Sequence, residues 1–196
     1  MWKATRSTDS AGRLDGAPSA LRRALGAFVL VVCGGAACVP AEPLPPEVPP
    51  SPAANSPPVE FGYATTNGGQ LTSTELRGRF AVLAFVATYD LASQAQIKVL
   101  GRVQRNHAPR VNVAAIALDP PENAPLVAAF ADGLRVPFPV ALADARTLAG
   151  HGPFEGLRHV PSIVILDRDG REVYRHLGAM DEKPLRAELE RLGARR

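Results

Sequence analysis

The sequence predicts an α/β domain with a central mixed sheet and helices on both faces. From residue 80 to residue 144, nearly continuous apolar runs alternate with helical stretches, which is typical of buried parallel strands joined by helices. Nearer the C-terminus, two β-rich runs flank Arg168-Asp169-Gly170, a strong signal for an antiparallel hairpin. Parallel crossovers, then an antiparallel hairpin and a last helix, give a mixed sheet.

The strands are predicted from apolar runs and turn residues. Residues 61–73 are expected to form a short N-terminal hairpin, because Asn67-Gly68 supplies the positive φ values of a tight turn. The other strands are expected at residues 80–87, 111–119, 138–144, 162–167 and 172–178.

Three helices are expected between and after these strands. They cover residues 90–106, residues 122–134 with Pro125 in the first turn and Gly133 near the end, and residues 181–193 as a capped amphipathic helix. The apolar faces are formed by Ala92, Ala95, Val99 and Val103 in the first helix and by Leu185, Leu189 and Leu192 in the last.

Residues 1–37 are predicted to be a signal peptide of the lipoprotein type. Arg22 and Arg23 precede a run of apolar and small residues that is shorter than the about 20 apolar residues of a membrane span. The run ends in Gly-Gly-Ala-Ala before Cys38, as a bacterial lipoprotein cleavage site does. We therefore expect cleavage before Cys38 and lipidation of its thiol. Lipidation at Cys33, a simple cleaved signal and an uncleaved anchor are the alternatives.

Residues 38–58 are predicted to be a proline-rich tether. Residues 39–58 hold nine of the chain's 19 prolines, which remove backbone donors and fix φ. Such a segment forms a semi-rigid polyproline II spacer of about 3.1 Å per residue, on the order of 60 Å in all. A ligand for an SH3-type domain is the alternative reading of its PxxP pattern.

The formal net charge of +3 belongs to the leader. Residues 1–37 hold five basic and two acidic side chains, and the remainder holds 17 of each. A neutral domain has no electrostatic footprint for nucleic acid, where neutralisation of the backbone phosphates dominates affinity, so a nucleic-acid partner is not expected.

A family resemblance is carried by three stretches: LRGRFAVLAFVATY (76–89), AAIALDPPENAPLVAAFADGLRVPFPV (114–140) and HVPSIVILDRDGREVYRHLG (159–178). In order and spacing they resemble the TlpA/ResA-like thioredoxin-fold family, the membrane-tethered thiol–disulfide oxidoreductases within the AhpC/TSA–redoxin superfamily. The resemblance implies a thioredoxin-like domain over residues 59–196 with an N-terminal β-hairpin extension. It also implies a place in the bacterial cell envelope, anchored to the membrane and facing the periplasm or the exterior.

The family's active site is a Cys-x-x-Cys motif at a strand-to-helix corner. Here Ala87 and Thr88 match the lead-in, Tyr89 stands for a tryptophan, and Asp90 and Ser93 occupy the cysteine positions. Thiol–disulfide exchange needs a thiolate, which neither a carboxylate nor a hydroxyl replaces. No catalytic residue is therefore expected, and Asp90 is predicted to be the N-cap of the helix.

Pro161 matches the family's cis-proline, which faces the active-site corner. The resemblance implies that Val160-Pro161 is cis and lies near Tyr89, Asp90 and Ser93, which together would form a partner-binding groove. A peptide would bind there as an added strand. The alternative is that the cis-proline only serves the fold.

No metal or cofactor is expected. His107, His151, His159 and His176 lack the spacing of a metal site, and copper binding or peroxidase chemistry would need thiols. His159 precedes Pro161 by two residues, so it is either a pH-sensitive contact at the groove or a solvated loop residue.

These observations favour a redox-inactive binding or scaffold module, held to the membrane by a lipid at Cys38 and binding a protein or peptide. One alternative is an accessory subunit in thiol–disulfide or antioxidant chemistry that uses a partner's thiols. Another is an enzyme with Asp90 as base or nucleophile, assisted by Ser93 or His159. A helix N-terminus favours the charged carboxylate, which makes this last reading the weakest.

Overall fold

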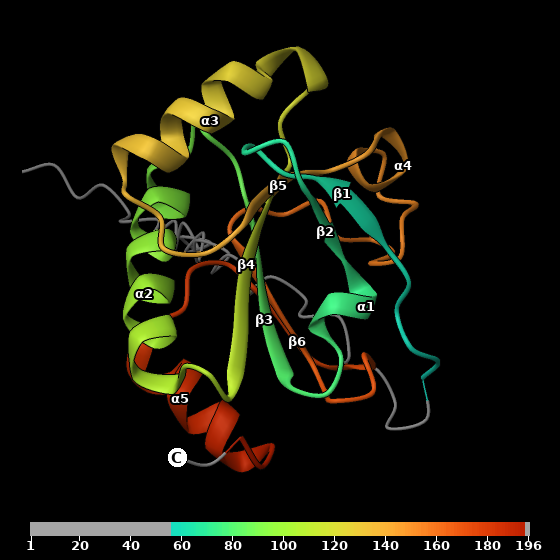
Figure 1. Ribbon diagram of the computed structural model, residues 1–196, viewed down its shortest axis with the longest axis vertical. Coiled ribbons are helices and arrows are strands. Elements are labelled where there is room, and N and C mark those ends of the chain that lie inside the picture. Colours follow the sequence, from blue (N-terminus) through green and yellow to red (C-terminus); the bar gives the residue numbers. More distant parts are fainter. Residues whose placement is uncertain (1–55, 195–196) are drawn as a thin grey trace, which may run out of the picture. The chain divides into compact units, whose positions relative to one another are not determined.

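A five-stranded mixed sheet runs through the middle of residues 56–194, the part of the chain that the computed structural model describes (Figure 1). The strand order is β5-β4-β3-β6-β7. The strands β3 (Phe80–Val86), β4 (Val111–Ala117) and β5 (Val140–Leu142) are parallel. The strands β6 (Ser162–Leu166) and β7 (Glu172–Leu177) complete the sheet as an antiparallel hairpin. The predicted mixed sheet is confirmed. The predicted signal peptide and most of the tether lie outside the described residues.

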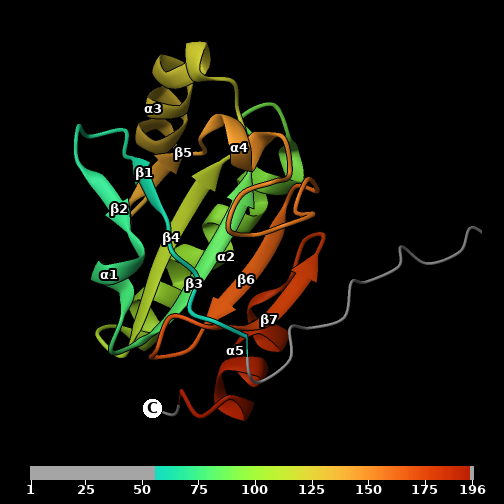
Figure 2. The ribbon, with the colours of Figure 1, turned by 90° about the vertical axis from the view of Figure 1, so that its right-hand side faces the viewer.

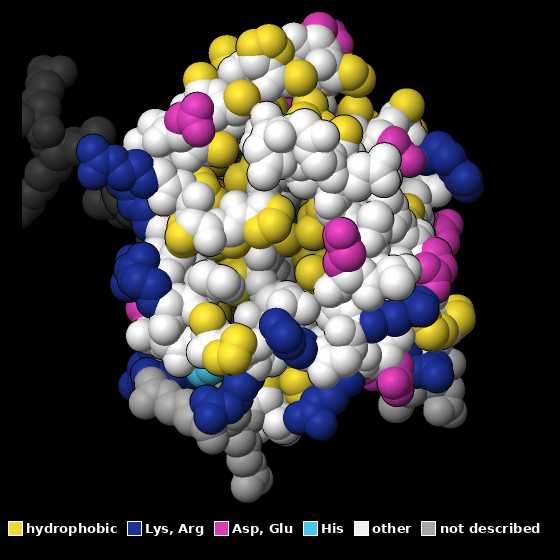
Figure 3. All heavy atoms as spheres, viewed as in Figure 1, with side chains coloured by type: hydrophobic (Ala, Val, Ile, Leu, Met, Phe, Trp, Pro, Cys, Tyr) yellow, Lys and Arg dark blue, Asp and Glu magenta, His cyan; other side chains and the backbone are white. Residues whose placement is uncertain are grey.

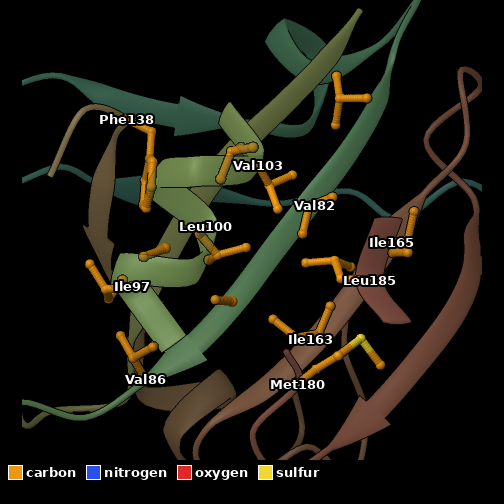
Figure 4. Close-up of a cluster of buried hydrophobic side chains, with 14 of the residues drawn as sticks. Val82, Val86, Ile97, Leu100, Val103, Phe138, Ile163, Ile165, Met180 and Leu185 are labelled. Carbon is orange, nitrogen blue, oxygen red and sulfur yellow. The ribbon is translucent and has the colours of Figure 1, made fainter. Parts of the chain in front are cut away.

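One face of the sheet is covered by the three longer helices, α2 (Leu91–His107), α3 (Ala124–Gly133) and α5 (Glu182–Arg191). A short 3₁₀ turn, η1 (Pro121–Asn123), precedes α3. Apolar side chains from these helices and from alternate positions of the strands form a buried cluster (Figure 4). Burial of such side chains is the main source of folding free energy. This core fixes where α2 begins relative to the end of β3.

The opposite face is covered mainly by non-helical structure (Figure 2). An N-terminal hairpin of β1 (Gly62–Ala64) and β2 (Gln70–Thr72) packs here with two single-turn helices, α1 (Ser73–Leu76) and α4 (Ala145–Leu148). Phe85 of β3 and Phe154 meet edge to face, with ring centroids 5.0 Å apart. The hydroxyl groups of Tyr63 and Thr147 are hydrogen-bonded at 2.8 Å, which ties the hairpin to α4. Helices thus lie on both faces, and those of the second face are one turn long.

The N-terminal hairpin is confirmed, but its turn differs from the prediction. Residues 65–69 form the loop, closed by a hydrogen bond of 3.0 Å from the Thr65 amide to the Gly69 carbonyl. Gly68 has a φ of 83°, whereas Asn67 does not adopt a positive φ. A two-residue type I′ turn, which Asn-Gly favours, needs positive φ at both central positions, whereas in this longer loop only Gly68 adopts it.

The buried face of α2 is rotated from the predicted one. Val99 and Val103 are buried as expected, but Ala92 and Ala95 are exposed. The face toward the sheet instead carries two polar side chains, Ser93 and Gln96, together with Ile97, Leu100 and Val103. Both polar groups on this face accept from backbone amides: the Ser93 hydroxyl from Ala87 at 3.2 Å and the Gln96 side-chain oxygen from Met180 at 2.7 Å.

The last helix agrees with the sequence except at its cap. Leu185 and Leu189 are buried and Leu192 is half-buried, as the stripe predicts. Asp181 occupies the N-cap position of α5, yet its side chain makes no capping hydrogen bond. Across residues 56–194, no helix combines the length and the apolar character that crossing a membrane requires.

Candidate functional site

The corner between β3 and α2 is built by backbone hydrogen bonds at the end of a fully buried strand. All seven residues of β3 are buried, and Ala87, Thr88 and Tyr89 carry the chain from its end to Asp90. The Asp90 amide donates to the Ala87 carbonyl at 3.2 Å, which closes the turn. The corner therefore points out from the carboxyl end of the sheet, where α/β folds place their sites.

Asp90 is the N-cap of α2, as predicted from the sequence. Its backbone is extended, with φ −102° and ψ 121°, and its carboxylate accepts from the amides of Ala92 and Ser93 at 3.3 and 2.8 Å. These amides are free donors of the first helical turn, so the carboxylate satisfies groups that would otherwise lack partners.

Ser93 adds a third hydrogen bond to the same carboxylate. Its hydroxyl donates to Asp90 at 2.6 Å and accepts from the Ala87 amide at 3.2 Å, and its side chain is fully buried. The Ser93 hydroxyl is the largest contribution that lowers the pKa of Asp90. The two backbone amides and the nearby charge of His159 add to the effect. Asp90 is thus charged at neutral pH and accepts three hydrogen bonds.

This arrangement leaves little room for chemistry at the two positions. A general base works best with a pKa near the operating pH, and the pKa of Asp90 is displaced in the opposite direction. The Ser93 hydroxyl has no imidazole hydrogen-bonded to it that could remove its proton. It donates instead to the Asp90 carboxylate, which caps the helix. In this structure the pair caps α2 and joins its first turn to the Ala87 amide.

The peptide bond between Val160 and Pro161 is cis, as the resemblance implied. Ser162 of β6 pairs with Phe85 of β3 in an antiparallel ladder, so Pro161, one residue earlier, lies at the level of Val86, the last residue of β3. The Ser162 hydroxyl donates to the His159 carbonyl at 2.6 Å and holds the loop before the proline. His159 is exposed and close enough for its charge to lower the pKa of Asp90, so this loop lies beside the corner.

Two large apolar side chains next to Asp90 are turned to solvent. Tyr89 is 76% exposed and Leu91 is 78% exposed. Single exposed apolar side chains are ordinary, whereas contiguous apolar patches mark interaction sites. Here two such side chains flank Asp90 in the sequence. The Tyr89 ring therefore does not pack beneath the neighbouring loop.

The chain was compared with known proteins at the levels of sequence and of structure. No family model and no curated protein matches the chain. Solved structures do match, over most of their own length. DsbF from MTB has 24% identity and a TM-score of 0.60, covering 70% of this chain and 99% of that one. A thiol:disulfide interchange protein of the thioredoxin family from Chlorobium tepidum TLS has 20% identity and a TM-score of 0.61, with coverages of 71% and 97%.

The fold is that of the thioredoxin-like thiol:disulfide oxidoreductases. A third structure with this fold is the pneumococcal exposed lipoprotein thioredoxin Etrx1 of Streptococcus pneumoniae strain TIGR4, at 18% identity and a TM-score of 0.58, covering 67% of this chain and 98% of that one. The thioredoxin-like fold predicted from the three sequence stretches is confirmed. At these identities the likeness concerns the fold, and the chemistry must be argued from this chain's own residues.

Within the thioredoxin-like domain, the predicted site residues fall into two groups. Tyr89, Asp90 and Ser93 form the corner, and Val160-Pro161 forms the loop opposite it, half-buried at Val160 and buried at Pro161. Their binding of a partner stays a prediction, as does the lipidation of Cys38, which lies outside the described residues together with Cys33. Residues 56–194 contain no group of three or more His, Cys, Asp or Glu side chains placed to hold a metal ion.

Asp119 is a residue of the corner that the sequence did not single out. It follows β4, is fully buried, and accepts from the Thr88 amide at 3.0 Å and from the Thr88 hydroxyl. A buried carboxylate with two such donors fixes the turn before Tyr89. An acidic residue directly after an apolar strand was the available signal, but its partner lies 31 residues away.

Proposed function

We propose that this chain is an exported, lipid-anchored thioredoxin-like protein whose corner binds a protein or peptide without exchanging disulfides. The observation that carries this proposal is the pair Asp90 and Ser93, which fills the corner with satisfied hydrogen bonds where an exchange reaction needs thiols. Etrx1, which shares the fold, is described as an exposed lipoprotein, and this supports the assignment of Cys38 to a lipid and of the domain to the cell envelope.

The exposed side chains at the corner supply the binding surface. Tyr89 and Leu91 flank the capped Asp90 and offer apolar area that no part of the described chain covers. An aromatic ring with a polar tip is a frequent anchor at protein interfaces. The backbone before the cis Val160-Pro161 bond, at exposed His159 and half-buried Val160, is available for an extended peptide.

Loss of redox chemistry is tested by comparing the native corner with a restored one. The native protein is expected to give no dithiothreitol-dependent reduction of insulin above a cysteine-free control. The double variant Asp90→Cys with Ser93→Cys places two thiols on the unchanged frame and is expected to gain activity. Reduction by the native protein would overturn the proposal.

Binding at the corner is tested by photo-cross-linking in native membranes. Ser93 is fully buried, so the probe belongs at Leu91, with a control probe at exposed Arg191 on α5. A discrete adduct at position 91 alone is expected, and it should disappear on Tyr89→Ala. A Cys-x-x-Cys protein in that adduct would favour the accessory subunit that uses a partner's thiols. Equal adducts at both positions, or none, would contradict a binding corner.

A further inference from the structure

The end of the domain opposite the corner carries a hollow of about 320 Å³ lined by Arg79, Arg110 and Arg168. We call it the arginine hollow. Phe80 and the end of the described chain at Gly193 and Ala194 also line it, and none of its lining residues is acidic. In the sequence, Ala194 is followed by Arg195 and Arg196, which lie outside the described residues. Figure 3 shows Lys and Arg side chains gathered along the lower part of the view.

The three arginines of the hollow have no carboxylate partner among the described residues. Six of the other ten described arginines do form an ion pair, namely Arg77, Arg102, Arg171, Arg175, Arg186 and Arg191. The Arg168 guanidinium lies 5.7 Å from the centroid of the Phe80 ring, which holds it at the rim of the hollow. Unpaired guanidinium groups around one concave surface are a binding surface for oxyanions, especially phosphate.

Two carboxylates lie nearby in the turn between β6 and β7, and both are engaged elsewhere. Asp167 accepts from the amides of Asp169 and Arg171 at 2.9 and 2.8 Å. Asp169 faces the Arg171 guanidinium at 4.0 Å. Neither carboxylate forms an ion pair with an arginine of the hollow, so the donors of these three guanidinium groups are left for an external anion.

The chain enters the described domain beside this hollow. The Val59 amide donates to the Gly170 carbonyl at 2.8 Å, and the Arg171 guanidinium donates to the Ser56 carbonyl at 2.8 Å. The Gly78 amide, at the hollow, donates to the Arg168 carbonyl at 2.8 Å. The segment that follows the proline-rich tether thus joins the domain at the turn that also supplies Arg168.

We infer that the arginine hollow binds the phosphate groups of anionic phospholipids and docks the domain on the membrane. In this arrangement the corner, at the other end of β3, faces away from the bilayer and stays open to a partner. The inference rests on the membrane tether of the proposed function, because a tether keeps the hollow at high effective concentration near lipid. Each basic side chain near an anionic membrane contributes about a fivefold gain in binding, or on the order of 100-fold for three.

The test measures co-sedimentation of residues 39–196 with vesicles, since this span contains the whole described domain, residues 56–194, with its complete five-stranded sheet. Vesicles with phosphatidylglycerol are compared with vesicles of phosphatidylcholine alone. The native chain is expected to bind the anionic vesicles only, and 1 M salt should abolish the binding because charge screening then acts within about 3 Å. The triple variant Arg79→Gln, Arg110→Gln and Arg168→Gln should bind on the order of 100-fold more weakly.

A charge-matched triple variant provides the control. Arg146→Gln, Arg158→Gln and Lys183→Gln remove the same charge from exposed positions away from the hollow and should change binding less than about twofold. Equal loss in both triples, or no preference for anionic vesicles, would overturn the inference. If adding inorganic phosphate changes the NMR chemical shifts of residues at the hollow but the chain does not bind vesicles, the hollow is a site for a free anion and the membrane-docking inference is overturned. Incorporation of labelled fatty acid at Cys38 in cells tests the tether separately.

Discussion

Replacing Asp90 by alanine tests whether the corner is held by its carboxylate. The variant loses two bonds to backbone amides and leaves the buried Ser93 hydroxyl without its acceptor. Loss of an N-cap costs about 1–2 kcal/mol. A buried donor left without a partner costs about 1–3 kcal/mol more. We therefore expect Asp90→Ala to lower the free energy of unfolding by about 2–5 kcal/mol.

Urea denaturation followed by circular dichroism measures this loss. Asp181→Ala is the matched control, since Asp181 occupies the same N-cap position of α5 without a capping bond, and it should cost less than about 0.5 kcal/mol. The double variant Asp90→Ala with Ser93→Ala removes the orphaned hydroxyl. It should cost at least about 1 kcal/mol less than the sum of the two single variants.

Two results would refute this reasoning. If Asp90→Ala costs no more than Asp181→Ala, the hydrogen bonds at the corner do not contribute to stability. If the double variant costs the full sum of the singles, Asp90 and Ser93 act independently, and the description of the corner as one capped unit is wrong.

Four further predictions follow from the same structure. Because the folded-state pKa of Asp90 is lowered, its charge stabilises the protein above the ordinary carboxyl pKa. Asp90→Asn should therefore be less stable than the native protein at neutral pH, and this difference should vanish as pH falls through the folded-state pKa. Denaturation at several pH values measures the difference. Burial raises the pKa of Tyr63 to about 12, so stability should fall between its ordinary value near 10 and 12, and less so in Tyr63→Phe. Leu100→Ala in the α2 core should cost about 2–5 kcal/mol in urea denaturation, whereas exposed Leu126→Ala should cost less than about 0.5 kcal/mol. Gly101→Ala should stabilise α2 by about 0.5–1 kcal/mol in the same assay, because a Cβ there meets its nearest atom, Arg105 Nη1, at 3.6 Å.

The long elements could be predicted from the sequence because each depends on a local pattern. The β3 run 80–86 is apolar throughout, and the β6–β7 turn carries Gly170 with a φ of 82°. The N-cap role of Asp90 also followed locally, from a carboxylate at the start of a helix. The cis bond before Pro161 was implied by the family resemblance.

The helix α1 was not predicted, although the capping box between Thr72 and Glu75 is a local signal for it.

Other features depend on tertiary contacts and could not be predicted. The buried polar face of α2 had none, because Ser93 is drawn inward by the Ala87 amide and Gln96 by the Met180 amide, 84 residues further along. The Thr88–Asp119 pair likewise joins two strand ends that only the parallel sheet brings together.

The way the chain joins the domain has a mechanical consequence. A pull on the tether is transmitted first through the Val59–Gly170 and Arg171–Ser56 hydrogen bonds to the β6–β7 turn. The corner lies at the far end of β3, seven residues or about 23 Å along the strand. If the proposed anchor holds residues 38–58 at the membrane, tension would therefore load this turn first and would reach Asp90 only through the sheet. Tension applied at the N-terminal end of the domain would therefore change the geometry at Tyr89 and Leu91 little, and a partner bound there would stay bound.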